Sequence, residues 1–472
     1  MDMHSSGAMP AKSAHLVVIG QGAAGLAAAL AAAEAARGLA INITLLEKAS
    51  EDEAGGNTRW TPAYMRMAAV DRVEPSFVRD MLQATQGRGD ENYFKRLADE
   101  APATVAWIAS HGVPFHQPDY YLAKGPPRIQ PVGGGAVIHR ELTRAAASAG
   151  VSFRHGCAAQ GLVSQDGRVT GVRLAAGDIV PAHAVVLACG GFQGNRDMMR
   201  EHLGPGAESL PLLAPRARHN TGDGIRMARD AGADSSGAWS GMHSEPIDPR
   251  ARNSAPVVLL YPYGIVVDRG GRRFFDEGGG LVHETWEWFS RHIHFAVAGR
   301  QAWAILDARV RAIPEWQRAT RSEVPPVEAD TLDALAQAIG VDPAGLAATV
   351  ATYNAACTGD PGRFDATRCD GLRATDALQP PKSNWARAIV EPPFLAWPLI
   401  GAVAYTFGGI ATSEKGEVLR GGAVFPGLYA AGEITGHFYG TAPNAVSVLR
   451  AFVFGRIAGR EAVAYVRATA GL

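Results

Sequence analysis

Two apolar runs flank an alanine-rich segment near the beginning of the chain. Residues 16–19 and 43–46 read LVVI and ITLL, and the helix-length segment 23–36 between them carries a single charge, at Glu34. Short continuous apolar runs are typical of strands buried on both faces of a parallel sheet, and a helix between two of them predicts a strand–helix–strand unit. The pattern therefore favours an α/β fold.

Apolar residues that recur every three or four positions predict further helices along the chain. These helices cover about 75–112, 136–150, 224–233, 285–298, 331–356 and 447–467. Residues 151–191 predict instead a small antiparallel meander with turns at 165–167 and 176–178, whose last strand is AVVLACGG. Between 240 and 385, tryptophan, histidine, arginine and proline occur in irregular order, which indicates an inserted domain.

The turn after the first apolar run has a glycine pattern that points to a dinucleotide. Gly20, Gly22 and Gly25 have G-x-G-x-x-G spacing between the predicted strand and helix. In this motif the first glycine permits a tight turn, the second lets the backbone approach a pyrophosphate, and the third lets helix and strand pack closely. The helix N-terminus offers N–H groups to phosphate, and Glu47 at the end of the second strand can accept hydrogen bonds from ribose. A glycine-rich turn in another kind of α/β unit is the alternative.

Length, charge and cysteine content narrow the function classes. A chain of 472 residues is longer than a single hydrophobic core usually accommodates, so two or more domains are expected. A formal net charge of −1 offers no basic surface for nucleic acid. The first 14 residues lack an apolar secretory segment, and LAAALAAAEAA is too short for a membrane span. The four cysteines form no C-x-x-C or haem-attachment pattern. We expect a cytoplasmic protein without stable membrane insertion or a metal site.

Several separated motifs follow one another in the order of a single family. They are GQGAAG at 20–25 with Glu47, GGNT at 55–58, AVVLACGGF at 184–192, NTGDG at 220–224, GRRFFDE at 271–277, YTFGGIAT at 405–412, GLYAAGEITG at 427–436 and FGRIAG at 454–459. With these motifs the chain resembles the flavoproteins of the fumarate reductase/succinate dehydrogenase family. Within that family it is most similar to the soluble branch of FAD-dependent tricarballylate dehydrogenases.

The resemblance implies bound FAD and a discontinuous α/β architecture. We expect a disordered N-terminus at 1–13, a Rossmann-like FAD-binding domain made of 14–240 and 386–472, and an inserted α+β capping domain at 241–385. The strand–glycine–acid theme of GLYAAGE repeats that of the first motif, so both ends of the chain are expected to build the nucleotide domain. A monomer or homodimer is expected.

The resemblance also assigns residues to the cofactor. Glu47 would meet the adenosine ribose, the amides at 447–449 would face the flavin pyrimidine edge, and Asn57 stands where membrane-bound members carry a histidine joined to the flavin. The FAD is therefore expected to be non-covalent. The full set is Gly20, Gly22, Ala23, Ala24, Gly25, Glu47, Lys48, Gly56, Asn57, Thr58, Ala158, Gly190, Gly191, Asp223, Gly432, Glu433, Ser447, Val448 and Leu449.

The catalytic positions of the family are only partly kept. Oxidation of a C–C bond beside a carboxylate needs polarising groups, a base for the alpha proton, and flavin N5 as hydride acceptor. Fumarate reductases supply a catalytic arginine shortly after the motif at 271–277, where this chain has Leu281. The family's substrate histidine falls on Tyr405, and its C-terminal substrate arginine falls near Ala442 or Pro443.

Five residues are candidates for the chemistry. They are His243, Tyr405, His283, Glu284 and Arg450. His243 matches another substrate-contacting histidine of the family with a one-residue gap, and Tyr405 occupies a ligand position. His283 and Glu284 follow the missing arginine, and Arg450 lies on the last helix near the flavin edge. The alternatives are a structural histidine, a core tyrosine, a solvated helix start and a salt bridge.

The leading interpretation is an FAD-dependent dehydrogenase or reductase that interconverts a C–C single and double bond beside a carboxylate. The substrate would be similar to tricarballylate or to succinate and fumarate, and an unknown external acceptor would take the electrons. One alternative is the same chemistry on a neutral ketone such as a 3-ketosteroid, and another is a flavin-binding redox protein without turnover. Arg273 and Glu277 are expected to form an ion pair within the cap.

Overall fold

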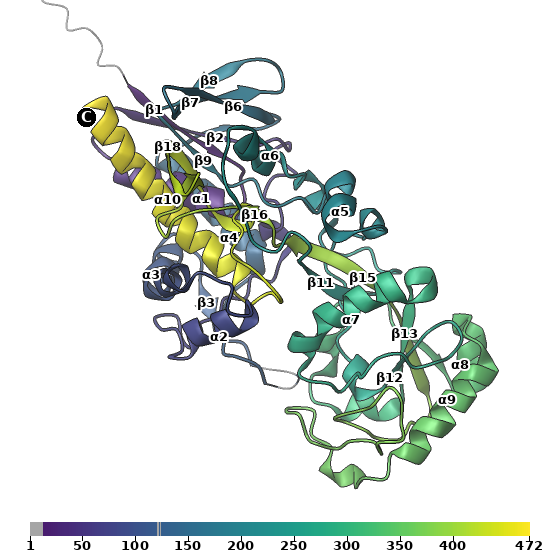
Figure 1. The fold of residues 1–472 in the computed structure, drawn as a ribbon. Coiled ribbons are helices and arrows are strands. Elements are labelled where there is room, and N and C mark those ends of the chain that lie inside the picture. Colours follow the sequence, from purple (N-terminus) through teal and green to yellow (C-terminus); the bar gives the residue numbers. More distant parts are fainter. Residues whose placement is uncertain (1–12, 120–121, 123) are drawn as a thin grey trace, which may run out of the picture.

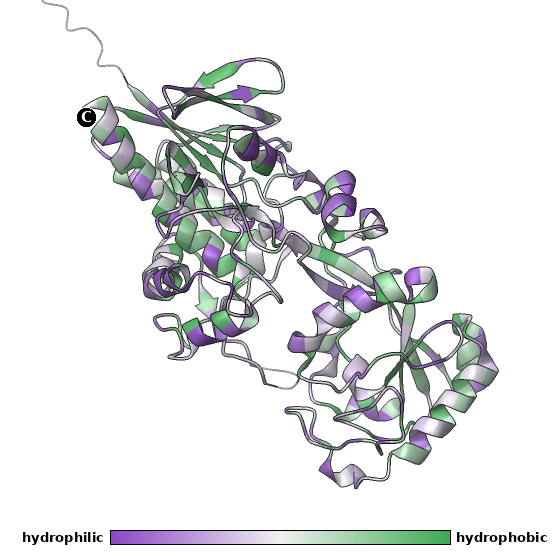
Figure 2. Cartoon of the chain, in the orientation of Figure 1, coloured by the Kyte–Doolittle hydropathy of each residue, from purple (hydrophilic) through white to green (hydrophobic). Residues whose placement is uncertain are grey.

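A computed structural model of the protein describes residues 13–119, 122 and 124–472. The chain forms two lobes, one built from both ends of the sequence and the other from its middle, which is green in Figure 1. Hydrophobic residues concentrate on the strands of both lobes, as Figure 2 shows. The expected disordered segment 1–13 lies outside the described residues, apart from Ser13.

The lobe built from both chain ends contains a six-stranded sheet. Its strand order is β17 (Glu417–Arg420), β18 (Ala423–Ala430), β9 (Ala184–Leu187), β1 (Ala14–Ile19), β2 (Ile41–Leu46) and β5 (Ser152–Arg154). Neighbouring strands are parallel except for the pair β17 and β18. Strands from both chain ends share this sheet, so the predicted discontinuous Rossmann-like fold is confirmed.

The prediction that AVVLACGG ends the antiparallel meander is wrong. The meander contains β6 (Ala159–Gln165), β7 (Arg168–Leu174) and β8 (Ile179–Pro181), whereas β9 lies between β1 and β18 in the main sheet. All four residues of β9 are buried apolar residues, which suits a central strand covered on both faces. In β7, the middle strand of the meander, Val169, Val172 and Leu174 are buried while Arg168 and Arg173 are exposed.

Two helices cover the main sheet and pack closely on each other. α1 (Ala23–Ala35) is buried almost throughout, and it lies against α10 (Ser447–Ala470). A Cβ atom on Gly455 would lie 2.4 Å from the carbonyl oxygen of Ala24, and one on Gly459 would lie 2.2 Å from that of Ala28. The two glycines therefore permit a backbone approach that no larger residue would allow.

The remaining elements of this lobe surround the sheet. The segment 75–112 forms two helices, α2 and α3, and the Asp90 side chain caps the second by accepting from the N–H groups of Asn92 and Tyr93. The elements are α2 (Phe77–Ala84), α3 (Glu91–Ser110), α4 (Gly134–Ser148), α5 (Arg196–Leu203) and α6 (Asp223–Asp230), with the short strands β3 (Phe115–His116), β4 (Gln130–Pro131), β10 (Ser235–Ser236) and β16 (Gly409–Ile410).

The second lobe has its own antiparallel sheet and helices. The sheet contains β11 (Met242–Ile247), β15 (Phe394–Thr406), β13 (Ala302–Leu306) and β12 (Ile265–Val267), and β14 (Val327–Ala329) also pairs with β15. α7 (Val282–Ala296), α8 (Leu332–Ile339) and α9 (Pro343–Ala356) pack around it (Figure 1). The segment 331–356 was expected to be helical throughout, but Gly340 ends α8 with a φ of +70° and Asp342 caps α9. β15 belongs to this sheet, although it follows the expected domain boundary at 385.

The expected ion pair between Arg273 and Glu277 is confirmed in the interior of the second lobe. Arg273 Nη2 lies 2.6 Å from Glu277 Oε2, and Lys382 Nζ lies 3.6 Å from the same oxygen. The other carboxylate oxygen accepts a 2.7 Å hydrogen bond from the N–H of Val266 in β12. All three charged side chains are buried away from water. The carboxylate and the two cations therefore stabilise one another's charge in place of solvent.

We expect Glu277→Ala to destabilise the protein by about 3–5 kcal/mol, because Arg273 and Lys382 would keep buried charges without their carboxylate. Denaturant unfolding followed by tryptophan fluorescence would measure the loss. The matched control is Glu328→Ala, which removes half of an exposed pair with Arg311 and should cost at most about 1 kcal/mol. Equal unfolding midpoints for the two variants would contradict the structural role of Glu277.

Candidate active site

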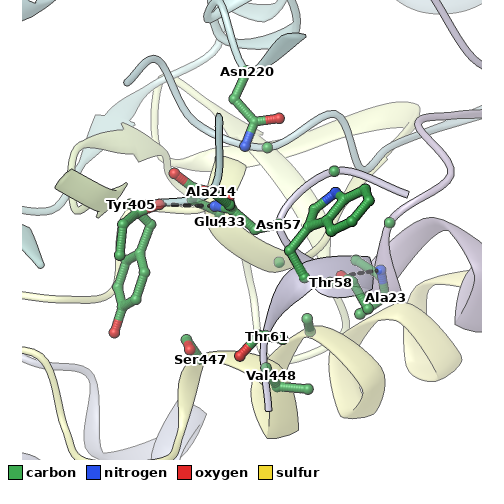
Figure 3. Close-up of a pocket in the computed structure, with 18 of the residues that line it drawn as sticks. Ala23, Asn57, Thr58, Thr61, Ala214, Asn220, Tyr405, Glu433, Ser447 and Val448 are labelled. Atoms are coloured by element: carbon green, nitrogen blue, oxygen red, sulfur yellow. Dashed lines mark hydrogen bonds between the residues drawn. The ribbon is translucent and has the colours of Figure 1, made fainter. Parts of the chain in front are cut away.

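One cavity connects the glycine turn after β1 with the N-terminus of α10. Its lining comes from the turn between β1 and α1, the end of β2, the segment 53–64, the start of α6, the end of β15 and the start of α10. Figure 3 shows Thr58 beside Ala23 at the start of α1, and Ser447 and Val448 at the start of α10. The cavity therefore meets the positive ends of two helix dipoles.

In the glycine turn, positions 20 and 25 have no room for a side chain. Gly20 has a φ of +105°, and a Cβ on it would lie 2.5 Å from the carbonyl oxygen of Ala188. A Cβ on Gly25 would lie 1.8 Å from the carbonyl oxygen of Gly20, whereas one on Gly22 would meet only Thr58 Oγ1, at 3.6 Å. Gly22 therefore leaves room in the cavity. It supplies no side-chain cap to α1; the N–H of Ala23 donates to Thr58 Oγ1 at 2.9 Å, and the positive end of the helix dipole faces the cavity.

Glu47 is fixed at the end of β2 by backbone amides. Its two carboxylate oxygens accept hydrogen bonds of 2.9 Å from the N–H of Gln21 and 2.8 Å from the N–H of Ala49. Next to it, Lys48 Nζ lies 2.8 Å from Asp223 Oδ2. Burial acts to raise the pKa of Asp223, but its hydrogen bond and charge interaction with Lys48 outweigh this and lower the pKa. This end of the cavity carries ordered carboxylates that suit ribose hydroxyls.

The other end of the cavity is organised around Glu433. Thr406 N–H donates to Glu433 Oε1 at 3.0 Å, and Gln193 Nε2 donates to Oε2 at 3.4 Å. Burial raises the pKa of Glu433 to about 7. Ser447 lines the cavity close by, at the first turn of α10, whose N-cap residue Val446 offers no side-chain cap. The N–H groups of this turn can therefore stabilise negative charge in the cavity.

His243 is held between two carboxylates. Its Nδ1 lies 2.9 Å from Glu287 Oε2 and its Nε2 lies 3.2 Å from Glu245 Oε1. Burial alone would lower the pKa of His243, but the hydrogen bonds and charges of the two carboxylates raise it to about 9. The imidazole is therefore protonated at neutral pH, and both ring N–H groups donate to carboxylates. Glu245 also lines the cavity, so its carboxylate connects the imidazole of His243 to the cavity.

Tyr405 lies beside His243 because the two residues are cross-strand partners on β15 and β11. Their ring centroids are 4.9 Å apart. Burial raises the pKa of Tyr405, and Glu287 adds to the effect, while a hydrogen bond with Ser447 opposes it. The phenol is therefore neutral and can donate a hydrogen bond. Figure 3 shows the Tyr405 side chain in the cavity wall near Ser447.

Of the other three candidate catalytic residues, His283 and Arg450 line the cavity and Glu284 does not. His283 lines the cavity, and burial together with the positive charges of Arg128 and Arg66 lowers its pKa to about 4. Arg450 is buried and also lines the cavity, with Nη1 3.2 Å from the carbonyl oxygen of Thr435. Glu284 is exposed and lies outside the lining; its carboxylate accepts a 3.1 Å hydrogen bond from the N–H of Leu281 and so caps α7.

The cavity brings most of the expected residues together. The lining includes Gly20, Gly22, Ala23, Ala24, Glu47, Lys48, Gly56, Asn57, Thr58, Gly190, Asp223, Gly432, Glu433, Ser447, Val448, His243, Tyr405, His283 and Arg450. Gly25, Ala158, Gly191 and Leu449 lie outside it. Gly25 packs on the turn, and a Cβ on Gly191 would lie 2.3 Å from Glu433 Oε1. Leu449 is buried in the hydrophobic core, and the Ala158 carbonyl accepts from the N–H of Ala175.

Several lining residues did not stand out in the sequence. They are Glu245, Tyr64, Arg128, Arg321 and Trp286. Glu245 is two residues after His243 on β11, and period-two spacing could have indicated it. Arg128 and Arg321 come from segments far apart in the sequence, neither of which has a motif.

The described residues contain neither a cluster of metal ligands nor a membrane-spanning helix. No cluster of three or more histidine, cysteine, aspartate or glutamate side chains there could hold a metal ion. No helix in the described part of the chain is long and apolar enough to cross a membrane.

The protein is a dinucleotide-binding flavoprotein by both its fold and its relatives. Over residues 15–447 it matches the family described as FAD binding domain, and it belongs to that family. It is 28% identical over 484 residues to a fumarate reductase (cytochrome) of Shewanella frigidimarina, covering 97% of this chain and 78% of the relative. It is 31% identical over 324 residues to 4-oxocyclohexanecarboxylate 2-dehydrogenase of Sinomonas cyclohexanicum, covering 62% of this chain and 54% of the relative.

A solved structure shows the same arrangement. The open conformation of a flavocytochrome c3 fumarate reductase has a TM-score of 0.75 and 25% identity, covering 96% of this chain and 79% of that chain. The chain is an FAD-dependent oxidoreductase acting on CH–CH groups. The two helix starts, the glycine turn and the ordered acids fit FAD.

We expect the FAD to be released by acid precipitation. Asn57 Nδ2 donates a 2.8 Å hydrogen bond to the carbonyl oxygen of Ala404, and an amide nitrogen is not a nucleophile. The absorbance spectrum of the supernatant would measure the released flavin, and free FAD added to heat-denatured protein is the control. Yellow colour that stays with the washed pellet would contradict non-covalent binding.

Proposed function

We propose that the protein interconverts a C–C single and double bond beside a carboxylate, on a substrate similar to tricarballylate or to succinate and fumarate. The observation that carries the proposal is the position of His243, held between Glu245 and Glu287 and beside Tyr405 in the wall of the cavity. Bound FAD would supply the hydride donor or acceptor at N5. An external electron partner is needed, because hydride exchange with one substrate leaves the flavin in the opposite oxidation state.

The cofactor contacts follow from the two ends of the cavity. The start of α1 would hold the pyrophosphate, Glu47 the adenosine ribose and Glu433 the ribitol. The first turn of α10 and the guanidinium of Arg450 would stabilise negative charge at the far end. These residues act by binding and by electrostatics, and none of them has to move a proton.

The proton chemistry is assigned to the residues around His243. Leu281 has no titratable group at the usual arginine position, so another group must exchange the proton at the alpha carbon. The carboxylate of Glu245 lines the cavity and is hydrogen-bonded to the imidazolium of His243, which Glu287 holds from behind. Glu245 is the group of this chain placed to exchange a proton with a bound molecule. Tyr405 would polarise a substrate oxygen by donating its phenolic proton as a hydrogen bond.

A neutral ketone is the second candidate substrate class. The specific observation in its favour is Tyr405 itself, because a phenol suits a carbonyl oxygen at least as well as it suits a carboxylate. The chain also lacks the family arginine at Leu281. The likeness to the 4-oxocyclohexanecarboxylate dehydrogenase supports a ketone at the reacting end of the substrate.

An anaerobic panel on the flavin-loaded enzyme tests the substrate class. We expect succinate or tricarballylate to bleach the oxidised flavin band, and fumarate to restore it after reduction. Dimethyl succinate is the matched neutral control and should leave the band unchanged. 4-Oxocyclohexanecarboxylate and a 3-ketosteroid complete the panel. Reaction of the steroid without reaction of any carboxylate would favour the neutral-ketone alternative and would overturn the leading proposal.

We expect kcat/KM to fall above about pH 9, because the pKa of His243 in the folded protein is raised to about 9 and the active form is protonated. Glu287→Gln removes one of the two carboxylates that raise this pKa, so the fall should begin at a lower pH. A pH–rate profile of each enzyme with the substrate found in the panel would measure the shift. Arg311→Gln, an exposed change in the second lobe, should leave the profile in place. An unchanged profile in Glu287→Gln would exclude the role of charged His243.

A further inference from the structure

Two arginines from different parts of the chain meet at the cavity around one tyrosine. Arg128 precedes β4, and its Cζ lies 4.0 Å from the centre of the Tyr64 ring. Arg321 follows β13 in the second lobe, and its Cζ lies 6.0 Å from the centre of the same ring. All three residues line the cavity. The close contact with Tyr64 restricts the guanidinium of Arg128, which lowers the entropic cost of placing it beside a ligand.

His283 adds a neutral hydrogen-bonding group at the same place. Its pKa is lowered to about 4 by burial and by the positive charges of Arg128 and Arg66. Within the described part of the chain its Nε2 is buried without a hydrogen-bond partner. A neutral imidazole with a proton on this nitrogen can donate to an anion.

The acidic residues of the cavity lining accept hydrogen bonds from their own neighbours. Glu47 accepts from Gln21 and Ala49, Glu53 from Arg218, Asp223 from Lys48, Glu245 from His243, and Glu433 from Thr406. Arg128 and Arg321 bring positive charge to the region around Tyr64.

We propose that Arg128 and Arg321, with His283, form a subsite that binds a carboxylate of the substrate. This inference rests on the proposed function, since it names the group by which that substrate is recognised. Guanidinium groups bind carboxylates through paired, charge-assisted hydrogen bonds, and two of them suit one carboxylate or two adjacent ones. The subsite selects carboxylate-bearing molecules over neutral ketones. It also gives the carboxylate one contact in each lobe, so binding would hold the lobes together over the cavity.

Binding of succinate and tricarballylate to the flavin-loaded enzyme tests the subsite without requiring turnover. The change in flavin absorbance on titration gives the dissociation constant. We expect Arg128→Gln and Arg321→Gln each to raise that constant by about tenfold or more, corresponding to about 1.4 kcal/mol, and Arg128→Lys to raise it less. Higher salt should weaken binding to the unaltered enzyme. Arg311→Gln is the matched control, since Arg311 pairs with Glu328 on the surface, and it should bind as the unaltered enzyme does.

The outcomes separate this inference from the proposed function. Unchanged dissociation constants in both glutamine variants, or equal binding of dimethyl succinate, would overturn the subsite even if the enzyme turns over. Carboxylates that bind through the two arginines without reducing or reoxidising the flavin would leave the subsite standing and overturn the proposed reaction. If Arg128→Gln fails to retain FAD, Arg128→Lys and Arg321→Gln decide the question. No binding of either carboxylate to the unaltered enzyme would also overturn the subsite.

Discussion

The close contact between α1 and α10 is the constraint on which the site depends. Gly455 and Gly459 let α10 approach the backbone of Ala24 and Ala28, so the two helices pack without intervening side chains. Their N-termini then both meet the cavity, one at the glycine turn and the other at Ser447. A dinucleotide has a pyrophosphate at its middle, and a flavin gains negative charge at one edge on reduction. Two positive helix ends on one cavity match both charges.

β15 connects this packed nucleotide lobe to the second lobe. The strand begins in the antiparallel sheet with β13 and β14, and it ends at Thr406, whose N–H donates to Glu433 in the nucleotide lobe. Its pairing with β11 places Tyr405 opposite His243, and a register shift follows directly after His243. One strand therefore fixes the tyrosine relative to both the acid beneath the cofactor region and the charged histidine. A change in the register of β15 would separate all three groups.

The sequence predicted the nucleotide end of the site better than its substrate end. Gly20, Gly22, Gly25 and Glu47 belong to one strand–helix–strand unit, and the spacing of the glycines and the acid within it indicates their physical roles. β9 was misplaced because a short apolar strand gives no information about which sheet it joins. Arg128 and Arg321 could not be paired from sequence, because only the folded chain brings both of them to Tyr64. Glu284 was favoured because it follows a vacant family position, yet a glutamate at the third position of a helix is equally suited to cap it.

The loss of the family arginine at Leu281 is accompanied by a different placement of charge. Leu281 directly precedes α7, and within the first two turns of that helix Glu287 reaches Nδ1 of His243 on β11. The buried positive charge in this part of the cavity therefore belongs to His243 on β11. It is balanced by the carboxylates of Glu287 on α7 and Glu245 on β11. A buried imidazolium with two carboxylates has a net negative charge, which disfavours a substrate carboxylate close to it. A dicarboxylate substrate would therefore keep its non-reacting carboxylate away from this cluster, toward Arg128 and Arg321. The proposed arrangement, with charge recognition at the junction of the lobes and proton chemistry on β11, rests on the electrostatics of the two clusters rather than on the family pattern.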